Sequence, residues 1–218
     1  MQRVLHPELL DSLSPDHPDA QHNRRDLRRI NRVMGNHSWL AKVIPPLLRP
    51  GERALEIGAG MGELGSILIR RGVAVDGLDL WPRPREWPAQ RLWHVADLRG
   101  FQDYDRYTAV FGNLIFHQFS FDELAMLGAK LDSVQTIVAC EPVRQRRSQA
   151  AFRVFSRLLA MNHVTRHDAH VTIAAGFRGH ELPDALGLDA KKWNVRCETT
   201  CLGAYRMLAT RRLVARPS

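Results

Sequence analysis

A short apolar run that ends in an acid and then breaks into glycines is the stretch of this sequence best suited to chemistry. Residues 53–57 (RALEI) are apolar enough to fill a buried parallel strand, and Leu64 and Leu68 resume at helical spacing after the glycines. Glycines let the backbone turn sharply and let a ligand approach the free N–H groups at the start of a helix. We therefore expect a strand, a glycine turn and a helix, with a ligand bound at the turn.

The acids around this turn indicate the kind of ligand. Glu56 lies at the end of the strand and Glu63 at the start of the helix, and two carboxylates disfavour the pyrophosphate of a dinucleotide. The dinucleotide pattern G-x-G-x-x-G does occur from Gly60 onward, but Gly58 already occupies the place directly after the strand where that pattern should begin. A cationic or neutral ligand fits the acids better.

Two later strands also end near an acid. The patterns over 73–79 and 91–98 predict strands, with Asp79 standing 21 residues after Gly58 and Asp97 close to the end of the second strand. An acid at the first of these places can accept hydrogen bonds from both hydroxyls of a ribose. The ligand is therefore expected to contain a ribose.

Taken together, these residues resemble the motifs of class I S-adenosylmethionine-dependent methyltransferases. The stretch 56–62 (EIGAGMG) is similar to the family's first motif, and a strand over 107–113 that continues as LIFHQF is similar to its fourth. The resemblance covers residues 50–142 well and the C-terminal strands loosely. It implies S-adenosylmethionine as the cofactor, with its ribose on Asp79 and its adenine beside Asp97. The full set of cofactor-binding positions that we predict is Glu56, Gly58, Ala59, Gly60, Asp79, Leu80, Asp97, Leu98 and Asn113.

The order of the remaining elements predicts the fold class. Strands and helices alternate, a further strand is expected over 134–140, and the strands 193–201 and 205–213 are expected to form a closing hairpin. This pattern predicts an α/β fold with an open, mostly parallel, Rossmann-like sheet, one reversed strand near its end and helices on both faces. The resemblance implies seven strands in the order 3-2-1-4-5-7-6.

Two regions outside the sheet are expected to cover the ligand. Residues 1–48, with helices over about 23–34 and 37–48, are predicted to form an N-terminal helical lid on a methyltransferase domain at 49–218. Residues 143–190 form an insertion on the substrate side. Because open α/β sheets bind ligands at the carboxyl ends of their strands, lid and insertion can together enclose a pocket there.

Two histidines are candidates for a catalytic base. His117 follows the fourth strand on the side where the methyl group should lie, and an imidazole ordinarily titrates near neutral pH. The alternative is that His117 only packs or caps the next helix. His167 is the second candidate. The alternative for His167 and Asp168 is a surface loop, and for Asp168 also a helix N-cap. We expect no metal site, because His167 and His170 face different directions if their segment is extended.

Composition leaves three functions open. The expected acceptor is a hydrophobic, phenolic or polyketide-like small molecule, methylated on oxygen. Trp39, Phe116, Phe119 and Phe177 are the candidates for its apolar walls, and the alternative for each is a place in the core. A net charge of +8 and a pI near 10.1 suit an RNA methyltransferase instead, but the Asp/Asn-Pro-Pro-Tyr/Phe signature of nucleobase methylation is missing. The third possibility is a non-catalytic protein that binds S-adenosylmethionine.

The chain has no apolar run of membrane-spanning length, and its first residues lack the pattern of a secretory signal. Cys140, Cys197 and Cys201 form an odd set without a C-x-x-C pair, so reduced thiols are expected. These features predict a cytoplasmic protein.

Overall fold

A single seven-stranded sheet forms the centre of the protein. The computed structural model describes residues 1–10, 13–14, 17–158 and 161–212. The strands lie in the order β3-β2-β1-β4-β5-β7-β6; β1 to β5 pair in parallel, and β7 is antiparallel to both its neighbours. The predicted fold class and strand order are confirmed, while Leu213 of the expected last strand lies outside the described residues. The strands are β1 (Arg53–Ile57), β2 (Ala74–Asp79), β3 (Trp93–Val95), β4 (Ala109–Asn113), β5 (Thr136–Pro142), β6 (Trp193–Thr199) and β7 (Ala204–Arg211).

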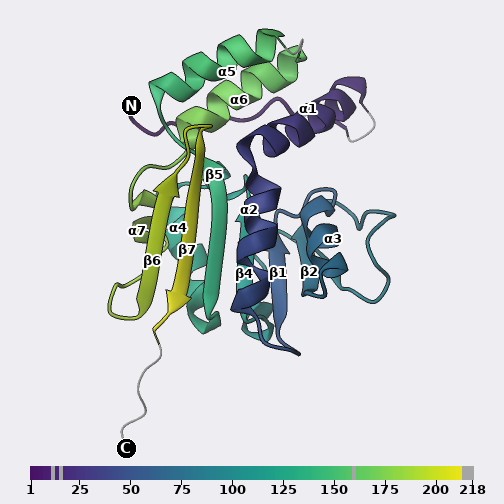
Figure 1. Cartoon of the computed structure of the whole chain (residues 1–218), viewed down its shortest axis with the longest axis vertical. Coiled ribbons are helices and arrows are strands. Elements are labelled where there is room, and N and C mark those ends of the chain that lie inside the picture. Colours follow the sequence, from purple (N-terminus) through teal and green to yellow (C-terminus); the bar gives the residue numbers. More distant parts are fainter. Residues whose placement is uncertain (11–12, 15–16, 159–160, 213–218) are drawn as a thin grey trace, which may run out of the picture.

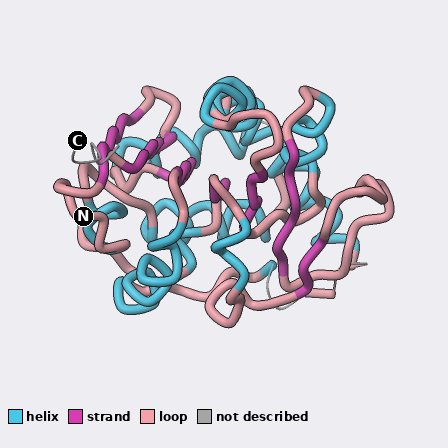
Figure 2. The backbone as a smooth tube through the Cα atoms, turned by 90° about the horizontal axis from the view of Figure 1, so that it is seen from below, coloured by secondary structure: helices cyan, strands magenta, loops and turns pink. Residues whose placement is uncertain are grey.

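Helices cover both faces of the sheet, as the strands' apolar residues require. In β1, Leu55 and Ile57 point to one face and Ala54 to the other, and all three are fully buried. Seen from below, the strands cross the molecule as a twisted band with helices on either side (Figure 2). One face carries α2 (Asn36–Val43) and α3 (Glu63–Arg70), and the other carries α4 (Phe121–Lys130) and α7 (Glu181–Ala185). Short 3-10 turns stand at Pro45–Leu47 (η2), Asp103–Arg106 (η3), Phe116–Gln118 (η4) and Leu131–Ser133 (η5).

A third group of helices lies across the carboxyl ends of the parallel strands. It consists of α1 (Pro18–Met34), α5 (Arg146–Leu158) and α6 (His163–Ala175), at the top of Figure 1. Helices α1 and α5 both contact α6. This roof layer places residues from the start and from the later part of the chain above the same end of the sheet.

Helix α6 corrects two interpretations of its segment. The segment is a helix, whereas an extended or loop conformation was considered for it, and Asp168 lies inside this helix instead of capping it. The cap is Asn162, whose side-chain oxygen accepts the Thr165 N–H at 2.8 Å. Asparagine at this place satisfies a free N–H group and so starts the helix.

The predicted N-terminal lid divides between two environments. Leu40, Ala41 and Ile44 of the α2 region are buried in the apolar cluster that covers the α3 face of the sheet. Helix α1, which begins earlier than expected because Pro18 suits a first helical position, lies in the roof layer. Movement of residues 1–48 as a lid stays a prediction. None of the helices in the described ranges combines the length and the apolar character needed to cross a bilayer.

Candidate active site

A cavity of about 1140 Å³ lies between the carboxyl ends of the strands and the roof layer. All nine positions predicted to bind a cofactor line it, and so does His117. Its roof is made by α1, α5 and α6, and one side by the N-terminal residues Glu8 and Leu10. The structure thus brings the strand-end residues together, as their places in the sequence predict.

The glycine turn between β1 and α3 needs glycine for steric reasons. Gly58 and Gly60 have φ values of +61° and +56°, a backbone conformation that residues with a side chain rarely adopt. A Cβ on Gly58 would also stand 2.6 Å from the Ile115 side chain. Helix α3 then starts without a side-chain cap. The turn therefore keeps its backbone close to the cavity and leaves free N–H groups at the helix start.

Two buried oxygen atoms beside this turn receive no hydrogen bond from any described residue. They are Oε2 of Glu56, whose side chain is almost fully buried, and Oδ1 of Asn113. Burial is the main cause that raises the pKa of Glu56 to about 8. The Gly65 N–H lowers this pKa, and the nearby charges of Asp79 and Glu63 raise it further. A buried acceptor without a donor costs free energy, so this part of the cavity is suited to a ligand that brings N–H groups or a positive charge.

The carboxylate of Asp79 is fixed at the end of β2. Its Oδ2 accepts the Gly60 N–H at 2.7 Å, and its Oδ1 accepts the Trp81 N–H at 2.9 Å. Each carboxylate oxygen has a second lone pair available for a ligand hydroxyl. The two backbone N–H groups therefore orient Asp79 before any ligand arrives.

Asp97 lies at the adjoining edge of the cavity and is already ion-paired. Hydrogen bonds from the Arg99 guanidinium lower its pKa, and the same guanidinium bonds Glu123 at 2.6 Å. Leu98 is buried nearby, whereas Leu80 is 68% exposed. An exposed leucine and a buried one at the same cavity give it apolar surface suited to a flat ring.

His117 is buried between two carboxylates. Its Nδ1 lies 2.7 Å from Oε2 of Glu141, and its Nε2 lies 3.3 Å from Oε1 of Glu8. Burial lowers the pKa of His117, but the charges and hydrogen bonds of the two acids outweigh it and raise the pKa to about 9. The expectation that this imidazole titrates near neutral pH is therefore wrong, because the site holds it as an imidazolium. Its role as a base stays a prediction.

Glu141 is the anchor of this group. It is fully buried at the end of β5, and its Oε1 accepts the N–H groups of Ile115 and Phe116, each at 2.9 Å. One carboxylate thus fixes both the His117 ring and the backbone that carries it. Strand β5 includes Glu141 because this residue pairs with Tyr205 of β7.

The N-terminal residues 1–10, here called the N-terminal strap, close one side of the cavity. Arg3 donates to the carbonyl oxygens of His117 and Phe119 at 3.0 and 2.8 Å. Asp168 accepts the N–H groups of Leu9 and Leu10 at 2.7 and 3.1 Å. Sequence reasoning missed the strap because it has no periodic pattern and its contacts lie more than 100 residues away.

The second predicted base, His167, lies elsewhere. It does not line the cavity; it faces an outer hollow between α5 and α6, with its Nδ1 3.1 Å from Oδ1 of Asp168. Of the four proposed aromatic walls, Phe119 lines the cavity, whereas Phe116 and Phe177 belong to the core and Trp39 packs against the apolar cluster on the α3 face. The apolar side chains that line the roof side include Leu27, Ile30, Met34, Phe152, Phe155 and Ile173.

Comparison with solved structures identifies the architecture. No family model and no curated protein matches the sequence. The plantazolicin methyltransferase BamL, crystallised with a triazolic desmethylPZN analog and SAH, superposes with a TM-score of 0.71 at 10% identity, over 93% of this chain and 92% of BamL. The chain has the class I methyltransferase fold.

Two further structures share this methyltransferase fold. The plantazolicin methyltransferase BpumL, also with a triazolic analog and SAH, gives a TM-score of 0.71 at 11% identity over 93% of both chains. A structure from work on the conversion of a disulfide bond into a thioacetal group during echinomycin biosynthesis gives 0.58 at 17% identity over 81% of both chains. At such identities the class I methyltransferase fold is what the chains have in common.

Proposed function

We propose that this protein transfers a methyl group from S-adenosylmethionine to a hydrophobic small molecule. The observation that carries the proposal is the continuity of the cavity, in which the predicted cofactor residues and the apolar roof side chains line one space of about 1140 Å³. That volume exceeds what a single drug-sized ligand ordinarily occupies. A cofactor and an acceptor can therefore lie side by side.

The residues present fit this cofactor. S-adenosylmethionine brings an ammonium group and two ribose hydroxyls, all of them donors, and the cavity offers the unpaired oxygens of Glu56 and Asn113 and the oriented carboxylate of Asp79. Leu80 and Leu98 supply apolar surface for the adenine ring. When bound, the cofactor supplies a methyl group made electrophilic by its sulfonium.

The acceptor side supports a hydrophobic substrate. Phe152 and Phe155 of α5 and Ile173 of α6 face the cavity opposite the glycine turn. The plantazolicin methyltransferases BamL and BpumL, which have the same fold, were crystallised with triazolic desmethylPZN analogs. A phenolic acceptor methylated on oxygen is the finer form of our proposal.

In this proposal the chain's own residues align the acceptor, exclude water and handle one proton. The roof layer and the strap enclose the acceptor. Enclosure holds the acceptor in line with the methyl group and excludes water, which would otherwise compete for it. A phenol must lose its proton, and His117 is one of the two described imidazoles that line the cavity, the other being His37. Because its pKa is about 9, only the minor, neutral fraction can act as a base at pH 7.

The test uses the whole chain with methyl-labelled S-adenosylmethionine and a fractionated extract of its source cells, with and without nuclease. We expect label in a nuclease-resistant, organic-extractable product. Label in a nuclease-sensitive fraction would establish RNA as the acceptor, and cofactor binding without label in any fraction would establish a non-catalytic binder. Each of these two outcomes contradicts the proposal.

The base role of His117 predicts a particular pH profile. With the true acceptor, turnover should rise as pH increases toward 9, because the imidazole must be neutral to accept a proton. Glu8→Gln removes one of the two acids that raise this pKa, so the rise should move to lower pH. Asp105→Asn, a matched change at an exposed position, should leave the profile unchanged. A His117→Gln variant with the parent's profile would remove His117 as the base.

A further inference from the structure

A second hollow, of about 390 Å³, lies between α5 and α6 on the outer side of the roof layer. We call it the α5–α6 groove. None of the described side chains that line it is acidic. Its lining consists of three arginines, three histidines, two neutral polar residues and two apolar residues: Arg153, Arg157, Arg166, His163, His167, His170, Gln149, Ser156, Phe152 and Ile173.

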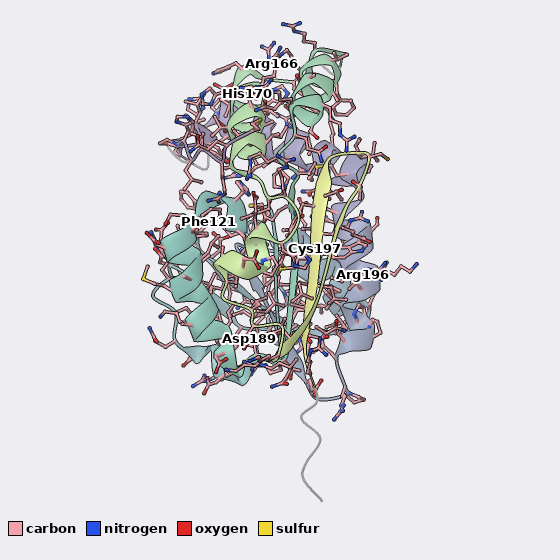
Figure 3. The ribbon with its side chains drawn as sticks, turned by 90° about the vertical axis from the view of Figure 1, so that its left-hand side faces the viewer. Phe121, Arg166, His170, Asp189, Arg196 and Cys197 are labelled. Carbon is pink, nitrogen blue, oxygen red and sulfur yellow. The ribbon has the colours of Figure 1, made fainter. Side chains whose placement is uncertain are left out.

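Helical spacing explains why the basic side chains converge. Arg153 and Arg157 are four residues apart on α5, so they lie on one face of it. His163, Arg166, His167 and His170 follow at spacings of three and four on α6 and share one face in the same way. The two helices contact each other, and Arg166 and His170 stand in the upper, outer layer of the molecule (Figure 3). Two basic stripes therefore face one hollow.

The chain's positive charge is concentrated in this region. Residues 142–180 contain seven arginines and one acid, Asp168, a net charge of +6 within a chain of net +8. Asp168 is buried and accepts the N–H groups of Leu9 and Leu10 in the strap. The one acid of the segment is thus used on the inner side of α6. Apart from its contact with His167, it pairs with none of the basic side chains that line the groove among the described residues.

The groove arginines differ from arginines elsewhere in the protein. Arg53, Arg99 and Arg144 each form an ion pair with an acid. Among the ion pairs between described residues, none includes Arg153, Arg157 or Arg166. Like charges at a spacing of four destabilise a helix, so a bound anion would relieve a repulsion that the sequence otherwise leaves in place.

We propose that the α5–α6 groove binds the phosphate group of a small phosphate-bearing ligand. Guanidinium groups form paired hydrogen bonds with phosphate oxygens, and three of them converge here. Phe152 and Ile173 give the groove an apolar floor for the organic part of such a ligand, and both also line the main cavity. The groove and the cavity therefore share a wall. This site does not depend on the proposed methyl transfer.

A short hollow favours a small ligand over a long nucleic acid. The basic stripes span one turn of α5 and two turns of α6. A protein that binds a long nucleic acid instead has its basic residues extended along a face, so that several successive phosphates are neutralised. The convergence on one hollow fits one or two phosphate groups.

The experiment is a calorimetric titration of the whole chain with inorganic pyrophosphate at fixed, low ionic strength. We expect saturable binding of one pyrophosphate per chain, weakened about tenfold or more in the variant Arg157→Gln/Arg166→Gln. Arg70→Gln, an exposed arginine at the end of α3, is the matched control and should change affinity less than twofold. Thermal unfolding of each variant verifies that it is folded. No saturable binding, or equal weakening by the control, would overturn the proposal.

A second arm separates the ligand classes. A single-stranded RNA of about 20 nucleotides is titrated at several salt concentrations, alone and with saturating pyrophosphate. If the groove serves small phosphate-bearing ligands, RNA binds weakly and pyrophosphate displaces it. Tight RNA binding with a steep salt dependence, unaffected by pyrophosphate, would mean an extended nucleic-acid surface and would refute the small-ligand site.

Discussion

Replacing Glu141 by alanine should destabilise the fold by about 3–5 kcal/mol, the cost of removing one partner from a buried ion pair. Glu141 is fully buried, and the change leaves the His117 imidazolium facing only Glu8 and removes the acceptor for the N–H groups of Ile115 and Phe116. Urea denaturation at pH 7, followed by circular dichroism, measures this loss.

The matched control is Asp132→Ala. Asp132 also pairs with one cation, Arg211, but its side chain is 68% exposed, and exposed ion pairs contribute about 0–1 kcal/mol. A loss of stability no larger for Glu141→Ala than for Asp132→Ala would show that the buried charges do not hold this part of the fold.

The sign of the pH dependence follows from His117. Its folded-state pKa of about 9 lies above its ordinary value near 6.5, so its contribution to stability is fully present below pH 6.5 and is lost as pH rises through about 9. The penalty of Glu141→Ala should therefore be larger at pH 6 than at pH 10, where the ring is neutral. A penalty independent of pH would contradict the charge assignment.

Replacing Asp79 by alanine should weaken S-adenosylmethionine binding by about 10- to 100-fold. The expected loss is about 1.5–3 kcal/mol, the usual worth of hydrogen bonds to a charged group, and a factor of ten corresponds to about 1.4 kcal/mol. Asp79 is suited to this role because the N–H groups of Gly60 and Trp81 already orient it. Isothermal titration calorimetry measures the affinity directly.

Asp105→Ala is the control for charge, since Asp105 is exposed and does not line the cavity. Its affinity should equal the parent's. If Asp79→Ala also binds within twofold of the parent, the ribose is held by other groups, and the assignment of the β2 end as the ribose site is wrong.

The meeting of the predicted cofactor-binding residues in one cavity could be expected from the sequence because its determinants are local. Asp79 and Asn113 each end a strand, Glu56 is the last residue but one of β1, and in a parallel sheet the strand ends meet at one edge. Glycine positions and apolar runs fix those strands within a few residues. The strand order followed from a family resemblance, which short-range patterns alone do not provide.

The roof was harder to predict because its contacts are distant and its sequence lacks a clear pattern. Helix α6 has three histidines, an arginine and an aspartate among its first eight residues, so its sequence lacks the apolar stripe by which a helix is usually predicted. Glu8 meets His117 across 109 residues, and nothing in the strap indicates that its acid enters a cavity. The raised pKa of His117 depends first on Glu141 and then on Glu8, and neither contact could be predicted from the sequence.

The reversed strand β7 has a consequence for how the chain folds. Strand β5 is buried along its whole length, yet its neighbour on one side, β7, comes about sixty residues later in the chain. Until β7 docks, a partly folded chain presents an open, apolar β5 edge, which is the kind of surface that pairs with other chains. Pairing over such a separation is also slow, because a long loop must close first. Docking of the C-terminal hairpin is therefore the step at which folding and aggregation compete.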